Sequence, residues 1–261
     1  MTHGYAYDHA WTDERIRLAG LEEALDPGTR EHLTRLGAGP GSRCLEVGAG
    51  GGSIASWLAD RVAPEGEVVA IDLETDFLET LVPVHPTLKV LRHDIAAADP
   101  PGGFDIAHAR YLIEWLPDKR LALKRMMNAL RPGGVLLVEE PDMVTMFEAV
   151  EPPELRRAMQ AAMRHLETTC PIEVEYGRHV VDDLTAVGLA GVEAEGRCPV
   201  VRGGSAPAAH FLKLTLLKLR AAVLAGNKLT ETEFSTALNA LNDPARTFYI
   251  PLTVAAWGRR P

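Results

Sequence analysis

Apolar positions along the first 145 residues fall alternately into short runs and into helical spacing. The runs predict strands at residues 43–49, 67–73, 88–95, 104–110 and 135–142, each bounded by Gly, Pro or Asp. Amphipathic spacing predicts helices at 14–25, 53–63, 74–84 and 118–134. The pair Asp26-Pro27 predicts a break, with a second helix over 28–37. Strands that alternate with helices favour a parallel sheet covered on both faces.

The pattern changes after residue 150. An amphipathic helix is predicted at 151–169 with no strand after it, then a helix, a Gly turn and a strand over 177–203. Two further helices are predicted at 206–226 and 230–241, and a closing strand lies within 246–260. We therefore expect N-terminal helices over 1–36, a core over 37–150, and the rest of the sheet over 151–261. Helical insertions at about 151–170 and 205–242 would form a lid over the strand ends.

Composition and charge limit the classes of partner that the protein is expected to bind. The chain has 261 residues, 46% hydrophobic and 24% charged, and its net charge of −9 argues against nucleic acid or an anionic membrane. No run of 18 apolar residues and no basic leader with an apolar core are present, so we expect no spanning helix and no signal peptide. Three scattered cysteines fit the reducing cytoplasm, and no Cys/His cluster predicts a metal.

The stretch "LEVGAGGGS", residues 45–53, carries the first chemical signal. A strand that turns into a helix through glycines brings backbone amides close to a ligand, at the carboxyl edge where ligands of open sheets bind. The next strand ends at Asp72, and an acid there can accept hydrogen bonds from both ribose hydroxyls. The pair predicts a nucleoside-containing cofactor. The alternative is a glycine-rich turn beside a solvated acid.

The loop does not match the two common phosphate-binding patterns. Ser53 occupies the place of the third glycine of G-x-G-x-x-G, and no Gly-Lys-Ser/Thr follows. Glu46, two residues before Gly48, would repel a pyrophosphate. A carboxylate there suits a ligand with an ammonium group and a sulfonium cation.

Together these residues carry a resemblance to a family. "LEVGAGGGS", "VVAIDL", "RHDI", "FDIAHARYLIEWLPD" and "ALRPGGVLLVEEPD" resemble, in order and spacing, the motifs of class I S-adenosylmethionine-dependent methyltransferases. The likeness covers residues 40–145 and extends to the terminal "AAWGRR", and the composition is similar to small-molecule methyltransferases of actinobacteria. It implies an α/β, Rossmann-like fold with a seven-stranded sheet and helices on both faces. The last strand would be antiparallel and inserted between the fifth and sixth.

The resemblance also implies the cofactor-binding residues. Glu46 and the backbone of Gly48, Ala49 and Gly50 would hold the methionine part. Asp72 would bind the ribose, Leu73 would lie against the adenine, Asp94 would accept from the adenine amino group, and Ile95 would pack on the face of the adenine ring. Arg110 and Tyr111 would lie where the methionine part meets the acceptor. Tyr7 would close the site, and Arg15 would bind the cofactor carboxylate. Arg110 could instead pair with an acid of the fold, and Tyr7 could simply pack.

No catalytic base stands out. His108 is one candidate, although the alternation of side chains along its strand could equally place it inside the sheet. Glu140 could bind a proton or cap an insertion, and His210 could act as a base from the lid. We expect a metal-independent transfer of a methyl group by in-line displacement to the O, N or C atom of a small, apolar, natural-product-like acceptor. A homodimer is possible. The alternatives are a scaffold use of the cofactor, as in a cyclisation, and a non-enzymatic cofactor-binding subunit.

Overall fold

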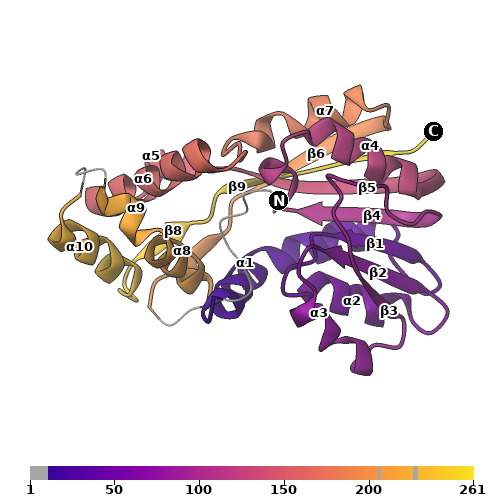
Figure 1. The fold of residues 1–261 in the computed structure, drawn as a ribbon, viewed down its shortest axis with the longest axis horizontal. Helices are drawn as coiled ribbons and strands as arrows, with labels where there is room; N and C mark the ends of the chain where they lie inside the picture. Colours follow the sequence, from indigo (N-terminus) through magenta and orange to yellow (C-terminus); the bar gives the residue numbers. More distant parts are fainter. Residues whose placement is uncertain (1–10, 205–206, 226–228) are drawn as a thin grey trace. The chain divides into compact units, whose positions relative to one another are not determined.

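The structure is a computed structural model that describes residues 11–204, 207–225 and 229–261. Its main feature is a seven-stranded sheet with the order β3-β2-β1-β4-β5-β9-β6 (Figure 1). Its strands are β1 (Arg43–Val47), β2 (Glu67–Asp72), β3 (Leu88–Arg92), β4 (Phe104–Arg110), β5 (Leu130–Asp142), β6 (Ala190–Arg197) and β9 (Leu252–Arg259). The pairs among β1 to β5 are parallel, whereas β9 runs antiparallel to β6 and lies between β5 and β6. The predicted fold and the insertion of its last strand are confirmed.

Helices cover both faces of this sheet, because its central strands carry apolar side chains on both sides. One core cluster joins β1, β2, β4 and β5 to α4 (Lys119–Ala129) and α7 (Val180–Ala186). The other joins the opposite face of these strands to α2 (Ser53–Val62) and to the end of α1. Successive residues of a strand point to opposite faces, so Leu45 lies in the first cluster and Cys44 in the second.

The first helix corrects one expectation. Helix α1 (Glu14–Arg35) runs without interruption through Pro27, where the sequence predicted a break between two helices. A proline in a helix removes one intrahelical hydrogen bond, and a long helix tolerates this as a bend when its two halves are held by packing. The position still matters, because the two halves belong to different compact units, divided between Leu25 and Asp26. The sequence signal therefore marks a boundary between units and not the end of a helix.

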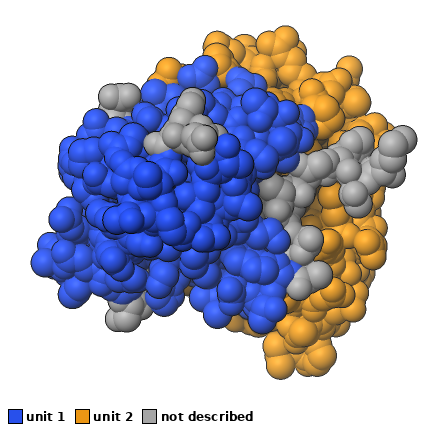
Figure 2. All heavy atoms as spheres, turned by 60° about the vertical axis from the view of Figure 1, so that its left-hand side comes forward, with its two compact units in different colours: residues 1–25, 142–175, 198–252 blue, residues 26–141, 176–197, 253–261 orange. Residues whose placement is uncertain are grey.

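The chain forms two compact units (Figure 2). Unit 2 comprises Asp26–Pro141, Tyr176–Arg197 and Thr253–Pro261, and it contains the large sheet with its covering helices. It also contains α3 (Asp76–Glu79) and three short 3-10 turns at Val82–Val84, Ile113–Trp115 and Tyr176–Arg178. Unit 1 comprises Met1–Leu25, Asp142–Glu175 and Cys198–Leu252.

Unit 1 is helical apart from one small antiparallel sheet of β7 (Val200–Arg202) and β8 (Thr247–Tyr249). Its helices are α5 (Met143–Ala149), α6 (Pro153–Thr169), α8 (Pro207–Lys218), α9 (Arg220–Ala225), α10 (Glu231–Leu241) and the first half of α1. Gly20 of α1 lies so close to α8 that an added Cβ would be 2.2 Å from the Pro207 carbonyl oxygen. The predicted insertions thus join residues 11–25 in one unit, and their role as a lid stays a prediction. None of the described helices is long and apolar enough to cross a membrane.

Candidate functional site

The candidate site lies at the carboxyl ends of the parallel strands in unit 2. From β1 the strand order runs to β2 and β3 on one side and to β4 and β5 on the other. Open α/β sheets bind ligands in the crevice at such a reversal, outside the carboxyl ends of the strands. The glycine loop follows β1 directly, so the sequence signal and the topology coincide.

The glycine loop has a fixed shape. The amides of Gly48 and Ala49 donate to the Ile71 carbonyl, and the Gly50 amide donates to Asp72 Oδ2 over 2.9 Å. Gly52 has a φ of 86°, and an added Cβ would be 2.5 Å from Leu81 Cδ1. Only glycine combines this left-handed backbone with such a close approach. The bond between Gly50 and Asp72 joins the two features that predicted a nucleoside.

The residues assigned to the nucleoside lie at neighbouring strand ends. Asp72 Oδ1 accepts from the Glu74 amide over 3.2 Å, and Leu73 is 41% exposed, so its side chain is accessible to a flat ring. Asp94 Oδ1 accepts from the Ala96 amide over 2.8 Å. Ile95 packs in the core cluster with 5% exposed. Its side chain therefore packs in the core, and its contact with an adenine stays a prediction.

Glu46 and His108 form a buried pair on neighbouring strands. They are register partners on β1 and β4, and His108 Nδ1 lies 2.7 Å from Glu46 Oε2. His108 is fully buried. The sequence allowed either a catalytic base or a buried residue at this position, and the structure shows a buried residue. Burial alone would lower the pKa of His108, but the carboxylates of Glu46 and Glu139 outweigh it and raise the pKa to about 9. A charged, enclosed imidazolium cannot take a proton from an acceptor.

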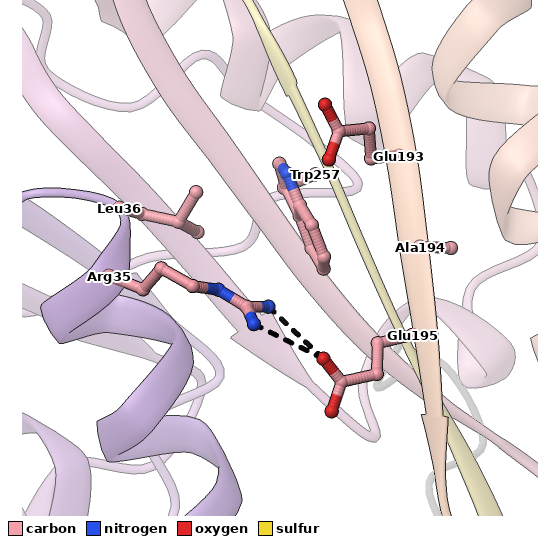
Figure 3. Close-up of a pocket in the computed structure, with 6 residues that line it drawn as sticks. All are labelled: Arg35, Leu36, Glu193, Ala194, Glu195 and Trp257. Carbon is pink, nitrogen blue, oxygen red and sulfur yellow. Dashed lines mark hydrogen bonds and ion pairs between the residues drawn. The ribbon is translucent and has the colours of Figure 1, made fainter.

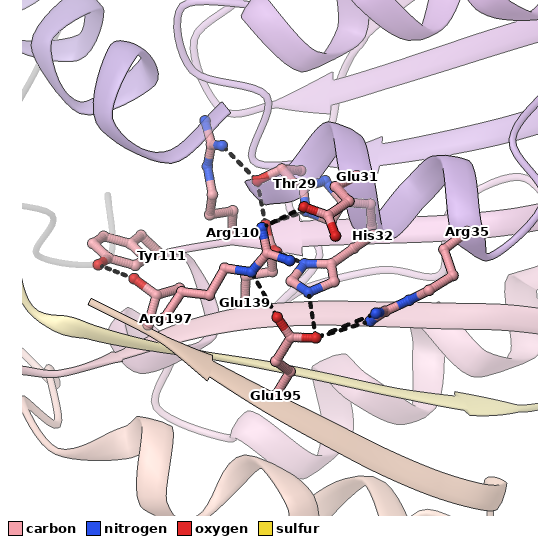
Figure 4. A network of polar contacts seen from close by, with 11 residues as sticks. Thr29, Glu31, His32, Arg35, Arg110, Tyr111, Glu139, Glu195 and Arg197 are labelled. Atoms are coloured by element: carbon pink, nitrogen blue, oxygen red, sulfur yellow. Dashed lines mark hydrogen bonds and ion pairs between the residues drawn. The ribbon is translucent and has the colours of Figure 1, made fainter. Parts of the chain in front are cut away.

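Glu139 on β5 is the centre of the same network (Figure 4). Its Oε1 accepts from His32 Nδ1 over 2.8 Å, and its Oε2 accepts from the Thr29 hydroxyl and lies 3.4 Å from His108 Nε2. Burial alone would raise the pKa of Glu139, but the hydrogen bonds from His108 and His32 lower it. Glu139 thus stays ionised inside the protein.

Arg110 binds an acid of the fold, which is the second reading that the sequence allowed. Its Nη2 donates to Asp26 Oδ1 over 2.9 Å and its Nη1 donates to Thr29 Oγ1 over 2.7 Å. Asp26 Oδ1 also accepts from the hydroxyl of Ser53, the first residue of α2 after the glycine loop. Tyr111 has a φ of 54°, and its buried hydroxyl lies 2.7 Å from Thr253 Oγ1. The start of the second half of α1 is therefore bound to the start of α2 and to the end of β4.

Glu140 points into the opposite face of the sheet and is fully buried. Its carboxylate accepts from the amides of Leu112, Ile113 and Glu114 over 3.2, 2.9 and 3.1 Å. Burial raises the pKa of Glu140 to about 7, and burial with the charge of Glu140 raises the pKa of Glu114 well above its usual value. Glu140 therefore holds the segment after β4, and its predicted role towards an acceptor stays a prediction.

The other predicted residues lie apart from this network. Arg15 pairs with Glu22 over 3.0 Å in the first half of α1, and His210 is half-buried on α8, so both belong to unit 1. Tyr7 lies outside the described residues. The cofactor assignments that the structure brings together are Glu46, the glycine loop and Asp72.

Sequence reasoning missed Asp26, Thr29, His32 and Glu139. The first three recur every three residues on α1, a spacing that puts them on one helix face. Glu139 lies in the apolar run "VLLVEEPD", where adjacent acids must point to opposite faces of a buried strand. Both patterns were visible in the sequence, although their partners were not.

A surface pocket of about 420 Å³ lies elsewhere on unit 2 (Figure 3). Its lining residues are Arg35, Leu36, Glu193, Ala194, Glu195 and Trp257. None of them belongs to the glycine loop or to the acids at the strand ends. Arg35 donates to Glu195 over 3.2 Å and lies over the Trp257 ring, so two of the charged groups of this pocket are paired with each other. In the described part of the chain no group of three or more His, Cys, Asp or Glu residues is arranged to hold a metal ion.

Two named proteins are similar to this chain in sequence. Methyltransferase str2 of Strobilurus tenacellus is 29% identical over 179 residues, which cover 66% of this chain and 62% of that protein. The trans-aconitate 2-methyltransferase of Azoarcus sp. (strain BH72) is 28% identical over 131 residues, 50% of this chain and 47% of that protein. The chain spans less than two thirds of the length of these relatives. Because one is fungal and the other proteobacterial, the actinobacterial likeness is not confirmed.

Solved structures share the fold. Phosphoethanolamine N-methyltransferase 2 of Haemonchus contortus, with S-adenosylhomocysteine bound, has a TM-score of 0.58 and 17% identity, covering 97% of this chain and 58% of that one. The [4+2]-cyclase SpnF has a TM-score of 0.54 and 16% identity, covering 91% and 81%. Likeness at this level of identity establishes the fold alone.

A family model matches far more of the chain than any single motif does. The model is described as a methyltransferase domain, and it matches residues 10–193. The match takes in the glycine loop, Asp72, the network around Glu139 and the first half of β6. This chain belongs to the methyltransferase-domain family.

Proposed function

We propose that this protein transfers a methyl group from S-adenosylmethionine to a small-molecule acceptor. One observation carries the proposal: the Asp72 carboxylate is bound to the Gly50 amide, beside Glu46, at the point where the strand order reverses. We assign the two ribose hydroxyls to the Asp72 carboxylate, because an ionised acceptor makes stronger hydrogen bonds than a neutral one. Membership of the methyltransferase-domain family supports the same cofactor.

The residues present fit this cofactor. Glu46 Oε1 has no hydrogen-bond partner among the described residues, and the side chain keeps 5% of its surface exposed. An ammonium group is the natural partner for such an oxygen, because a charge-assisted hydrogen bond compensates a buried carboxylate. When bound, the cofactor would supply an electrophilic methyl group on its sulfonium. The glycine loop would bind the amino-acid end along its backbone, and Leu73 would lie against the base.

The acceptor is proposed to be small. The net charge of −9 disfavours nucleic acid, and the name of the Azoarcus relative gives a small organic acid as that protein's substrate. The apolar residues of helix α6, which suggested an apolar acceptor, are buried within unit 1: Leu155, Met159 and Met163 are 1%, 2% and 5% exposed. Core packing accounts for them, so the proposal concerns the size of the acceptor and leaves its polarity open.

The transfer requires that donor and acceptor lie in line and that water is excluded. A hydroxyl acceptor must also lose a proton. His108 and Glu140 are enclosed by their own partners, so neither receives that proton in the described structure. His210 on α8 stays a proposal for this role.

Calorimetry and mass spectrometry test the proposal. We expect micromolar binding of S-adenosylmethionine and S-adenosylhomocysteine, followed by the gain of one methyl group by an acceptor from a panel of small acids, phenols and amines. Cofactor binding with an isomerised product of unchanged mass would favour the scaffold use of the cofactor, a chemistry that SpnF shows this fold can host. Binding with no product from any acceptor would favour a cofactor-binding subunit. No binding to folded protein would overturn the proposal.

A further inference from the structure

The two oxygens of Glu46 have different surroundings. Oε2 is bound to His108 Nδ1 over 2.7 Å, whereas Oε1 has no hydrogen-bond partner among the described residues. The side chain is 95% buried, since only 5% of its surface is exposed. Oε1 is not among the fully buried atoms that lack a partner, so it is accessible to a ligand, and the hydrogen bond at Oε2 holds the direction in which it points.

We propose that His108 is a positioning residue for Glu46. By donating from Nδ1 to Oε2, the ring holds the carboxylate so that Oε1 stays available to the amino-acid part of a ligand on the glycine loop. This inference rests on the proposed function, because it names how that ligand is bound. His108 itself touches no ligand and acts only through Glu46.

The ring of His108 is held in turn from its other side. Its Nε2 lies 3.4 Å from Glu139 Oε2, and Glu139 accepts from Thr29 and His32 on α1. Both ring nitrogens therefore face carboxylates, and the fully buried ring is fixed between two neighbouring strands. A ring clamped in this way restricts the rotation of Glu46, which is the property that a positioning residue needs.

The effect should be confined to one end of the ligand. Glu46 precedes the glycine loop on β1, whereas Asp72 ends β2 and would bind the ribose. S-adenosylhomocysteine carries the amino-acid group, and 5′-methylthioadenosine has the same nucleoside without it. A change at His108 should therefore weaken the first ligand and spare the second.

Two substitutions separate the two hydrogen bonds of the ring. In His108→Asn the amide nitrogen falls near the place of Nδ1, so it can still donate to Glu46 but not to Glu139. In His108→Gln the amide nitrogen falls near the place of Nε2, so it reaches towards Glu139 and leaves Glu46 unheld. Titration calorimetry of the full chain with both ligands gives four affinities, each compared with the wild type.

We expect His108→Gln to bind S-adenosylhomocysteine about tenfold more weakly, because it loses a charge-assisted hydrogen bond to Glu46. Its affinity for 5′-methylthioadenosine should change less than about twofold, and His108→Asn should keep most of its affinity for both ligands. Equal losses for the two ligands, or equal losses in the two variants, would overturn the inference. If the wild type binds neither ligand, the proposed function fails, and this inference fails with it.

Unfolding is controlled within the same experiment, because an unfolded variant binds neither ligand. A second measurement uses the wild type alone. In nitrogen-15 spectra of the imidazole rings, S-adenosylhomocysteine should shift the His108 Nδ1 resonance, and 5′-methylthioadenosine should leave it in place. Equal shifts with both ligands, or no shift with either one bound, would contradict the role of His108 even if both variants fail to fold.

Discussion

Glu139 and Glu140 are adjacent on β5, yet the protein shifts the pKa values of their carboxyl groups in opposite directions. Both are fully or almost fully buried. Glu139 faces His108 and His32, whose hydrogen bonds overcome burial and lower its pKa. Glu140 faces the other side of the sheet, where burial raises its pKa to about 7 despite three backbone donors. One side of the strand end therefore carries a permanent charge, and the other holds a proton near neutral pH.

Stability should decrease as the pH rises towards neutrality. Burial raises the pKa of Glu140 to about 7, and burial with the charge of Glu140 raises the pKa of Glu114, so the folded state keeps protons that the unfolded chain releases near pH 4.5. Between the pKa of the unfolded state and that of the folded state, each such proton lowers the free energy of unfolding by about 1.4 kcal/mol for every unit that the pH rises. Glu114→Gln removes the neighbouring charge, so we expect a flatter pH profile and a more stable protein at pH 8. Urea unfolding from pH 5 to 8 measures both.

The matched control is Glu65→Gln, which removes an exposed carboxyl group. It should follow the wild-type profile, because this side chain is in contact with solvent in the folded protein as it is in the unfolded chain. A Glu114→Gln profile as steep as that of the wild type would show that the pair does not hold the proton.

Glu139→Gln should destabilise the protein strongly at neutral pH. It leaves His108 charged and buried with one carboxylate instead of two, and breaking a buried ion pair costs about 3–5 kcal/mol. The lowered pKa of Glu139 means that its contribution is present above about pH 4.5 and is lost as the pH falls through the folded-state value. The difference from wild type should therefore narrow at acidic pH.

Chemical denaturation at pH 7 and pH 3 checks this prediction. Glu151→Gln is the control, because Glu151 pairs with Arg156 at the surface and its side chain is 62% exposed. Its loss should be under about 1 kcal/mol. If the two variants cost the same, the network around Glu139 does not stabilise the fold.

Asp72→Asn should weaken the binding of the ribose without changing the shape of the glycine loop. The amide oxygen can still accept from the Gly50 amide, so the loop keeps its shape, but the charge offered to the ribose hydroxyls is gone. We expect about a tenfold loss of affinity for S-adenosylhomocysteine with little change in melting temperature. Calorimetry and thermal unfolding measure the two effects. Unchanged affinity would remove Asp72 from the cofactor site.

Gly52→Ala should distort the start of α2. The backbone has a φ of 86°, and the new Cβ would lie 2.5 Å from Leu81 Cδ1 and 2.9 Å from Leu78 Cδ2. Strain of this kind costs about 1–3 kcal/mol. Gly39→Ala is the matched control, because the atom nearest to its Cβ would be 3.9 Å away and no positive φ is involved. Equal stability of the two variants in thermal unfolding would contradict this reading of the loop.

The strands and most helices of unit 2 could be predicted from the sequence, because the spacing of apolar residues is a local property of strands and helices. "RCLEV" and "EVVAID" are buried strands, as predicted, and the strand "LTVAAWGR" is inserted antiparallel beside β6. The continuous α1 could not be predicted, since a proline inside a helix is tolerated only where packing stabilises the residues on both sides of it.

The sequence by itself determined the glycine loop, Asp72 and the strands that precede them, because each follows from residue types at short spacing, whereas the order of the strands in the sheet was implied by the resemblance to methyltransferase motifs. Only the tertiary structure decided that His108 binds Glu46 and that Arg110 binds Asp26. It also decided which of the two adjacent glutamates stays charged. Those outcomes depend on contacts between side chains that lie up to 110 residues apart in the sequence, as for Thr29 and Glu139. They also depend on burial, which strengthens electrostatic interactions and shifts pKa values.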